Sequence, residues 1–135
     1  MKPRKRTILT GICVVLAVCF ALHSYRFARA ERHWLLDRAS AIGDASRVAL
    51  LLRLGADPNG RRDTRYYMDY GWTVTEPTPP LFVAASAGHT EVVRLLLANG
   101  ADPAIRAIEE MTPRDIAEFG GHTGVVQLID ESQHK

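Results

Sequence analysis

Cysteine is scarce in this chain, and its two cysteines, Cys13 and Cys19, both lie in an apolar stretch near the N-terminus. A spacing of six residues places them on different faces of a helix, so a disulfide between them is not expected. Residues 31–135 contain no cysteine. That part of the chain therefore has no thiol nucleophile and no thiolate metal ligand, and it can fold in an oxidising compartment without a disulfide.

Acidic residues are absent from residues 1–30, which carry six of the 17 lysines and arginines. All 15 aspartates and glutamates follow, where they outnumber the other 11 basic residues. The formal net charge of +2 therefore hides a mildly acidic body. Because this body is mildly acidic and its charges of both signs are interspersed, binding to nucleic acid is not expected.

Motifs for catalysis or metal binding are also missing. No HExxH, no paired CxxC, no GxSxG turn and no glycine-rich phosphate loop occurs. Ser86 and His89 are neighbours on a short turn and do not form a triad. The sequence therefore predicts no enzyme, no catalytic residue, no cofactor, no metal site and no small-molecule substrate.

Residues 7–25 form an apolar run without a formal charge, behind the basic start MKPRKR. As a helix this run would be about 28 Å long, close to the roughly 30 Å hydrocarbon core of a bilayer. We interpret residues 1–30 as a basic start with a single-pass signal-anchor. The basic start then stays in the cytoplasm and the body lies on the far side, which is the periplasm in a Gram-negative bacterium. The alternative is a signal peptide cleaved near Ala30, because Ala28-Arg29-Ala30 fits a cleavage site.

Residues 80–102 repeat after 33 residues. Pro80, Ala84, Gly88 and His89 correspond to Pro113, Ala117, Gly121 and His122, and Leu95 corresponds to Leu128. An earlier stretch matches the same residues after a shift of 45, for example Gly43 on Gly88 and Gly55-Ala56-Asp57 on Gly100-Ala101-Asp102. The chain therefore contains three repeats, at about residues 34–59, 79–104 and 112–135, with an insertion at 60–78.

The stretch PPLFVAASAGHTEVVRLLLANGAD resembles the ankyrin repeat, whose pattern is TPLHxAAxxGHxEVVxLLLxxGAD. The resemblance implies an all-α solenoid of about three helix-turn-helix units with hairpin or loop fingers, here preceded by the N-terminal apolar helix. It assigns residues 31–135 to one repeat domain, in a small protein of bacterial type. His89 and His122 occupy equivalent repeat positions, so we expect a structural role for both.

Local signals place the helix ends of each repeat. We expect Thr90 to cap the second helix of the middle repeat and Gly100 to end it in the left-handed conformation. In the last repeat, Thr112 and Asp115 form a capping box around Pro113. This repeat has Arg114 and Asp130 where the middle one has leucine, which predicts the solvent-facing side of a C-terminal cap.

The insertion contains most of the tyrosines of the chain and one of its two tryptophans. In ankyrin-like proteins its position is a hairpin finger, so residues 64–75 are expected to form two short strands about a turn near residues 69–71. Aromatic and arginine side chains are typical of interface hot spots, but the same rings could also cover the edge of the repeats. The candidate partner-binding residues are Arg65, Tyr66, Tyr67, Tyr70 and Trp72.

Two functions follow from these patterns. The first is a non-enzymatic protein-binding module, tethered to a membrane by residues 7–25 and contacting its partner with the finger tips and the concave side of the stack. The second is a cleaved, soluble periplasmic protein that acts as an immunity, inhibitory or stress-protection factor. In both, the expected partner is a protein.

Overall fold

The computed structural model describes residues 15–21, 32–61, 66–67, 73–74 and 78–134. The chain divides into two parts, residues 1–31 and residues 32–135. In the first part, residues 15–21 are helical, and every one of them is exposed. The exposed side chains include Val15, Leu16, Val18 and Phe20, each more than half accessible.

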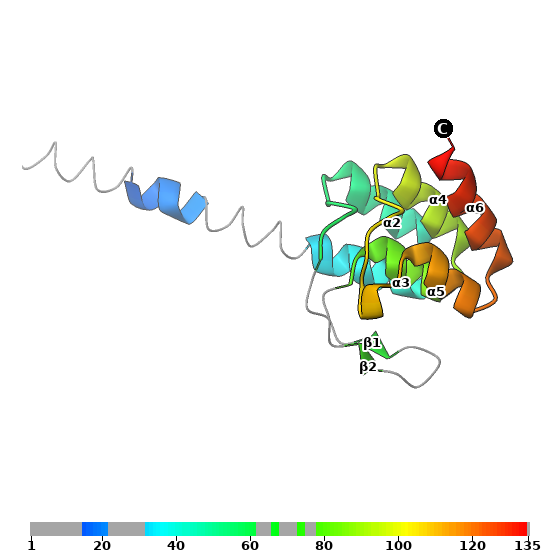
Figure 1. Cartoon of the computed structure of the whole chain (residues 1–135). Helices are drawn as coiled ribbons and strands as arrows, with labels where there is room; N and C mark the ends of the chain where they lie inside the picture. Colours follow the sequence, from blue (N-terminus) through cyan, green and yellow to red (C-terminus); the bar gives the residue numbers. More distant parts are fainter. Residues whose placement is uncertain (1–14, 22–31, 62–65, 68–72, 75–77, 135) are drawn as a thin grey trace, which may run out of the picture. The chain divides into compact units, whose positions relative to one another are not determined.

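The second part is built from three helix pairs, each joined by a tight turn (Figure 1). Repeat 1 contains the helix at residues 32–42 and α2 (Ala45–Arg53). Repeat 2 contains α3 (Pro80–Ser86) and α4 (Thr90–Ala98), and repeat 3 contains α5 (Pro113–Phe119) and α6 (Thr123–Gln133). Helices α2, α4 and α6 pack side by side in one row, and α3 packs against α5 in the other. This arrangement is the predicted helical solenoid.

Glycine supplies the turn inside each pair. Gly43, Gly88 and Gly121 have φ angles of +75°, +73° and +72°, which residues with a β-carbon rarely adopt. Gly100 has a φ of +86° and follows α4, as predicted. The turns therefore repeat with the sequence, and every pair closes in the same way.

The predicted N-cap was right in repeat 3 and wrong in repeat 2. Thr112 and Asp115 form the capping box at the start of α5. In repeat 2, the N-cap residue of α4 is His89, and Thr90 is the first residue of the helix. Its hydroxyl lies 3.5 Å from the carbonyl oxygen of Gly88 and bonds no amide of α4. The backbone leaves the helical conformation one residue before Thr90, at φ −79° and ψ 76°.

The core runs through all three repeats. Leu36 and Val48 from repeat 1, Phe82 and Leu96 from repeat 2, and Ile129 from repeat 3 are fully buried in one apolar cluster. Repeat 2 is covered on both sides, and six consecutive residues at the start of α3 are buried. Sandwiching between neighbours explains why this repeat has the most apolar sequence.

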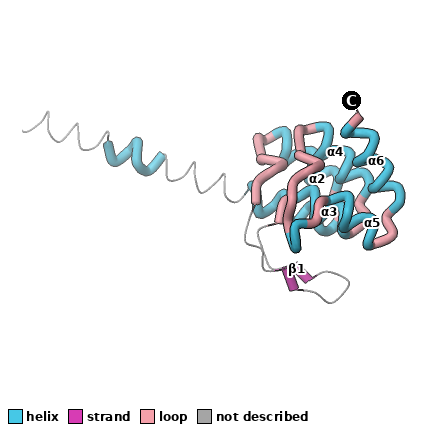
Figure 2. The backbone as a smooth tube through the Cα atoms, in the orientation of Figure 1, coloured by secondary structure: helices cyan, strands magenta, loops and turns pink. Residues whose placement is uncertain are grey.

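The insertion contains one short strand pair, β1 (Tyr66–Tyr67) and β2 (Thr73–Val74), shown in magenta in Figure 2. The two strands are antiparallel, with Tyr66 opposite Val74 and Tyr67 opposite Thr73. This pair confirms the predicted hairpin strands, while the predicted turn at 69–71 lies outside the described residues. The finger of repeat 2 has a short 3₁₀ helix, η1 (Ile108–Glu110).

Within the parts of the chain that the structure describes, no helix has both the length and the apolar character needed to cross a membrane. The expected membrane segment, residues 7–25, lies mostly outside those parts, because only residues 15–21 of it are described.

Candidate protein-binding surface

Two histidines join consecutive repeats. The Nε2 atom of His89 lies 3.0 Å from the carbonyl oxygen of Ala41, and that of His122 lies 3.0 Å from the carbonyl oxygen of Ser86. A carbonyl only accepts, so each ring donates its N–H to the end of the helix in the preceding repeat. These bonds give both histidines the structural role that their repeat positions predicted.

Asn59 joins the loop of repeat 1 to the loop of repeat 2. Its Nδ2 donates to the carbonyl oxygen of Gly100 at 2.9 Å, and its Oδ1 accepts from the amide of Asp102 at 2.7 Å. Asp57 fixes the backbone of Asn59 by accepting from its amide at 2.9 Å. Three hydrogen bonds thus hold the point where the chain enters the insertion.

Arg61, two positions after Asn59, makes a further bond between the same two loops. Its Nη2 donates to the carbonyl oxygen of Arg106 at 2.6 Å, and Nη1 of Arg106 donates to the carbonyl oxygen of Glu110 at 3.1 Å. Glu109 and Glu110 are exposed and have φ angles of +51° and +62°. The two fingers are therefore tied together at their bases, and the glutamates lie at a solvated tip.

Of the five candidate binding residues, Tyr66 and Tyr67 form strand β1. The other three, Arg65, Tyr70 and Trp72, lie outside the described residues. Whether this aromatic cluster binds a partner or covers the edge of the repeats is not tested, and both roles stay predictions. What the structure adds is the clamped base of the finger, formed by Asn59 and Arg61.

Sequence reasoning missed this clamp. The only available signal was that Asn59 follows Gly-Ala-Asp-Pro where repeat 2 has Ala104. Asparagine is common in turns for local reasons, so the sequence alone could not indicate a partner more than 40 residues away.

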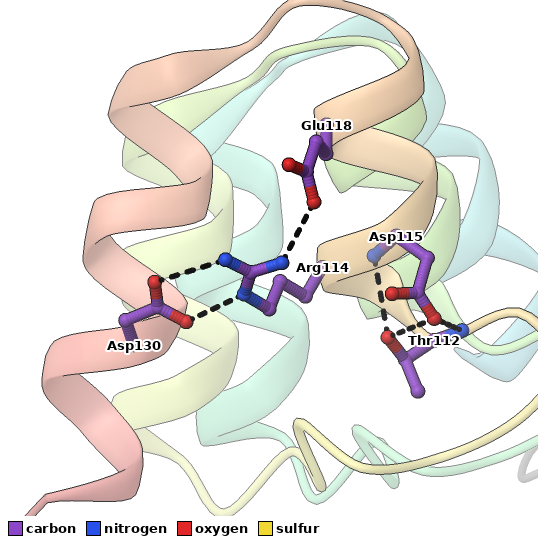
Figure 3. Close-up of polar contacts among 5 residues, drawn as sticks. All are labelled: Thr112, Arg114, Asp115, Glu118 and Asp130. Carbon is purple, nitrogen blue, oxygen red and sulfur yellow. Dashed lines mark hydrogen bonds and ion pairs between the residues drawn. The ribbon is translucent and has the colours of Figure 1, made fainter.

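The far end of the stack carries the charges predicted for a C-terminal cap. Figure 3 shows Arg114 between Asp130, at 2.8 Å, and Glu118, at 2.7 Å. The hydrogen bond to Asp130, followed by that to Glu118, raises the pKa of the Arg114 guanidinium. This ion-pair network joins α5 to α6 at positions where repeat 2 has Leu81 and Leu97.

A hollow of about 520 Å³ lies beside this network, and its lining includes Glu118, Asp130 and Glu131. Among the residues with described positions, no three histidine, cysteine, aspartate or glutamate side chains are close enough to hold a metal ion.

Comparison with known proteins agrees with the geometry. The profile of the family described as "Ankyrin repeats (3 copies)" matches residues 36–135, which is most of the chain. The chain belongs to the ankyrin repeat family, whose stacked helix pairs and fingers are those described above.

Curated relatives match part of the chain. The chain is 43% identical over 82 residues to the 2-5A-dependent ribonuclease of Mus musculus, covering 61% of the chain and 10% of that protein. It is 40% identical over 58 residues to the ARF GTPase-activating protein GIT1 of Homo sapiens, covering 43% and 8%. It is 30% identical over 82 residues to the sex-determining protein fem-1 of Caenorhabditis elegans, covering 61% and 12%. The chain spans about a tenth of the length of these relatives.

Proposed function

We propose that this protein is a non-enzymatic protein-binding module that presents the aromatic finger of repeat 1 to its partner. The observation that carries this proposal is the clamp at the base of the finger. Asn59 and Arg61 bond to the next finger, so an inserted hairpin starts from a fixed position. Preorganising a binding loop lowers the entropy lost on association, which favours a partner site over a loose insertion. Tyr and Trp side chains then supply the contact area.

The double variant Tyr70→Ser/Trp72→Ser tests this role. Loss of two aromatic anchors should weaken partner binding by at least about 2 kcal/mol, or roughly 30-fold. The measurement is capture of the partner from the envelope fraction by wild-type and variant chains, with thermal melting of each. Phe119→Ser, which removes an exposed aromatic side chain from repeat 3, is the matched control.

Two results would contradict the proposal. Unchanged capture would exclude the finger as the binding surface. A large fall in melting temperature in the double variant, absent from the control, would mean that the aromatic rings cover the repeats.

We further propose that residues 7–25 tether the module to a membrane. The support is the uncharged 19-residue run behind a basic start, together with the exposure of every residue from 15 to 21. Large apolar side chains such as Leu16 and Phe20, exposed on a helix, need an apolar environment. In this proposal MKPRKR stays in the cytoplasm and the repeats lie across the membrane, in the periplasm if the source is a Gram-negative bacterium.

The second candidate is a soluble periplasmic factor with an inhibitory, immunity or stress-protection role. The observation that favours it is the Ala28-Arg29-Ala30 sequence, which fits a signal-peptide cleavage site. The intact mass of the mature chain decides between the two. A chain that begins at Glu31 would exclude the tether, whereas a mass that includes residues 7–25 would exclude cleavage.

A further inference from the structure

Repeat 1 exposes positions that are covered in the other two repeats. Leu35 is 37% exposed, but its equivalents Pro80 and Pro113 are buried. Leu50 is 54% exposed, but its equivalents Leu95 and Leu128 pack against the core.

The preceding repeat provides this cover. The structure describes no repeat after repeat 3. Even so, the positions equivalent to Leu35 and Leu50 are as buried in repeat 3 as in repeat 2. Their burial therefore comes from repeat 2, on the side towards the start of the chain. The corresponding side of repeat 1 is the end of the stack, which we call the N-terminal end face.

Two arginines occupy this face at positions that are apolar elsewhere. Arg38 is equivalent to Val83 and Ile116, and Arg47 is equivalent to Val92 and Val125, all four of which are buried. Exposed apolar side chains occupy other positions of the same face. The N-terminal end face consists of Trp34, Leu35, Arg38, Arg47 and Leu50.

The opposite end of the stack has a different composition. There Arg114 is paired with Asp130 and Glu118, whereas at the N-terminal end face Arg47 is paired with Asp44 at 3.5 Å and Arg38 lies over Trp34. Residues 112–134 carry one arginine against four carboxylates, whereas residues 32–54 carry four arginines against two aspartates. The repeat domain is therefore polarised, with a basic and apolar end and an acidic end.

A surface that combines arginine, leucine and tryptophan is typical of proteins that lie on a phospholipid surface. Leucines enter the boundary of the acyl chains, tryptophan lies at the level of the headgroups, and arginine binds anionic headgroups. Arg38 already lies over the ring of Trp34, with its Cζ atom 5.5 Å from the ring centroid. In this arrangement the aliphatic stem of Arg38 can remain among apolar groups while its guanidinium reaches the headgroups.

Chain length restricts the distance from this face to the membrane. Residues 26–31 connect the apolar run to the helix at 32–42. Six residues span at most about 20 Å when fully extended. If residues 7–25 are embedded, the start of repeat 1 cannot lie farther than this from the bilayer surface.

We propose that the N-terminal end face of repeat 1 docks on the anionic phospholipid surface of the membrane that holds the tether, and this inference rests on the tether of the proposed function. Docking fixes the stack with its acidic end away from the lipid. The face is thus a second, peripheral membrane contact, made by the folded domain.

The test uses the full chain reconstituted into vesicles, with Trp72→Phe leaving Trp34 as the single tryptophan. The vesicles contain brominated phosphatidylcholine, which quenches nearby tryptophan, with or without phosphatidylserine. We expect Trp34 to be quenched in the anionic vesicles and less so in the neutral ones. Arg47→Glu should reduce the docked population by at least about fivefold, because it replaces one basic charge at the surface by an acidic one.

Leu50→Glu should reduce the quenching further, and Phe119→Glu is the matched control. Both replace an exposed apolar side chain by a carboxylate, but Phe119 belongs to the opposite end of the stack. Thermal melts of each variant establish that the repeats remain folded. Equal quenching of Trp34 in wild type and Leu50→Glu would overturn the proposal.

Flotation of the vesicles in alkaline carbonate tests separately whether residues 7–25 are embedded in the bilayer. If the chain is retained but Trp34 is not quenched, the docking proposal fails and the tether stands. If the chain is washed off in carbonate but Trp34 is quenched at neutral pH on anionic vesicles, the tether fails and the face still binds lipid. A dimer in detergent that Leu50→Glu dissociates, together with unquenched Trp34, would assign the face to a second copy of the chain and overturn docking on lipid.

Discussion

Gly43 and Gly88 lie against the histidine ring of the next repeat. A β-carbon built on Gly43 would approach the Nδ1 atom of His89 to 2.7 Å, and one built on Gly88 would approach the same atom of His122 to 2.6 Å. The glycine therefore does two things at once, because it permits a positive φ angle and leaves room for the ring that bonds the preceding helix. At the scale of single residues, this pairing joins one repeat to the next.

Replacement of Gly43 by alanine tests the pairing. The positive φ angle alone should cost about 1–2 kcal/mol, and displacement of the His89 ring should add about 1–3 kcal/mol. Gly55→Ala is the matched control, because Gly55 has a φ of +83° and nothing within 4 Å of the added carbon. The measurement is the free energy of unfolding by chemical denaturation. Equal losses in the two variants would show that the ring does not constrain Gly43.

The sequence predicted the equivalence of His89 and His122, but not their partners. Equal spacing shows that a residue belongs to the repeat. The carbonyl of Ala41, however, lies 48 residues before His89, and a backbone carbonyl is not marked by any particular side chain in the sequence. The error at Thr90 has a related cause. Threonine is a frequent N-cap, but here the chain enters the helix through His89, whose ring is fixed by the neighbouring repeat.

The first turn of α5 shows how a single element is stabilised at its end. Asp115 accepts from the amide of Thr112 at 2.9 Å and from its hydroxyl at 2.7 Å (Figure 3). The backbone hydrogen bond, followed by the hydroxyl, lowers the pKa of Asp115 below its ordinary value of 3.8. Because the charged form is favoured in the folded state, this interaction stabilises the protein fully above pH 3.8 and is lost as the pH falls through the lower folded-state pKa.

Asp115→Ala should therefore lower the melting temperature at neutral pH, and the difference from wild type should shrink below pH 3.8. Loss of a capping interaction typically costs about 0.5–2 kcal/mol. The measurement is thermal melting by circular dichroism from about pH 7 to about pH 2. Glu131→Ala, which removes an exposed carboxylate of α6, is the control. A difference that stays constant through this range would contradict the role of the charged carboxylate.

In the finger of repeat 1, the strand pair could be predicted from the sequence, but the clamp at its base could not. Its β-branched and aromatic residues predicted the strand pair, which the backbone contains at Tyr66–Tyr67 and Thr73–Val74. The clamp by Asn59 and Arg61 depends on carbonyl groups of the next finger, and backbone carbonyls look alike in every sequence. The candidate residues were therefore chosen by composition and stay a prediction, while the clamp became visible only in the fold.

In the described repeats, stability depends on stacking, because the helices of neighbouring repeats pack against each other in one apolar core. Periodicity predicted the number and order of the repeats, since the same spacing places the same side chains in contact with each neighbour. It also predicted the charged C-terminal cap, but not the exposed face of repeat 1. That face follows from comparing the exposure of Leu35 and Leu50 with that of their equivalents, which only the structure provides.

Leu96→Ala tests the dependence on stacking. Leu96 is fully buried in the repeat that is covered on both sides, so its truncation should cost about 2–5 kcal/mol. With only three repeats, a loss of this size is expected to unfold the domain at physiological temperature. Leu54→Ala, at a side chain that is 54% exposed, is the matched control. Thermal melting that matched the wild type would show that the middle repeat is not the centre of the core.

The bonds of Asn59 and Arg61 to the neighbouring loop have a practical consequence. They hold the entrance to the first finger, so the stack does not depend on the length of chain that follows. Lengthening a closed loop costs little, about 0.6 kcal/mol for each doubling. This finger is therefore a place where an unrelated recognition loop could be grafted, and where the specificity of the protein could change while the scaffold beneath it stays the same.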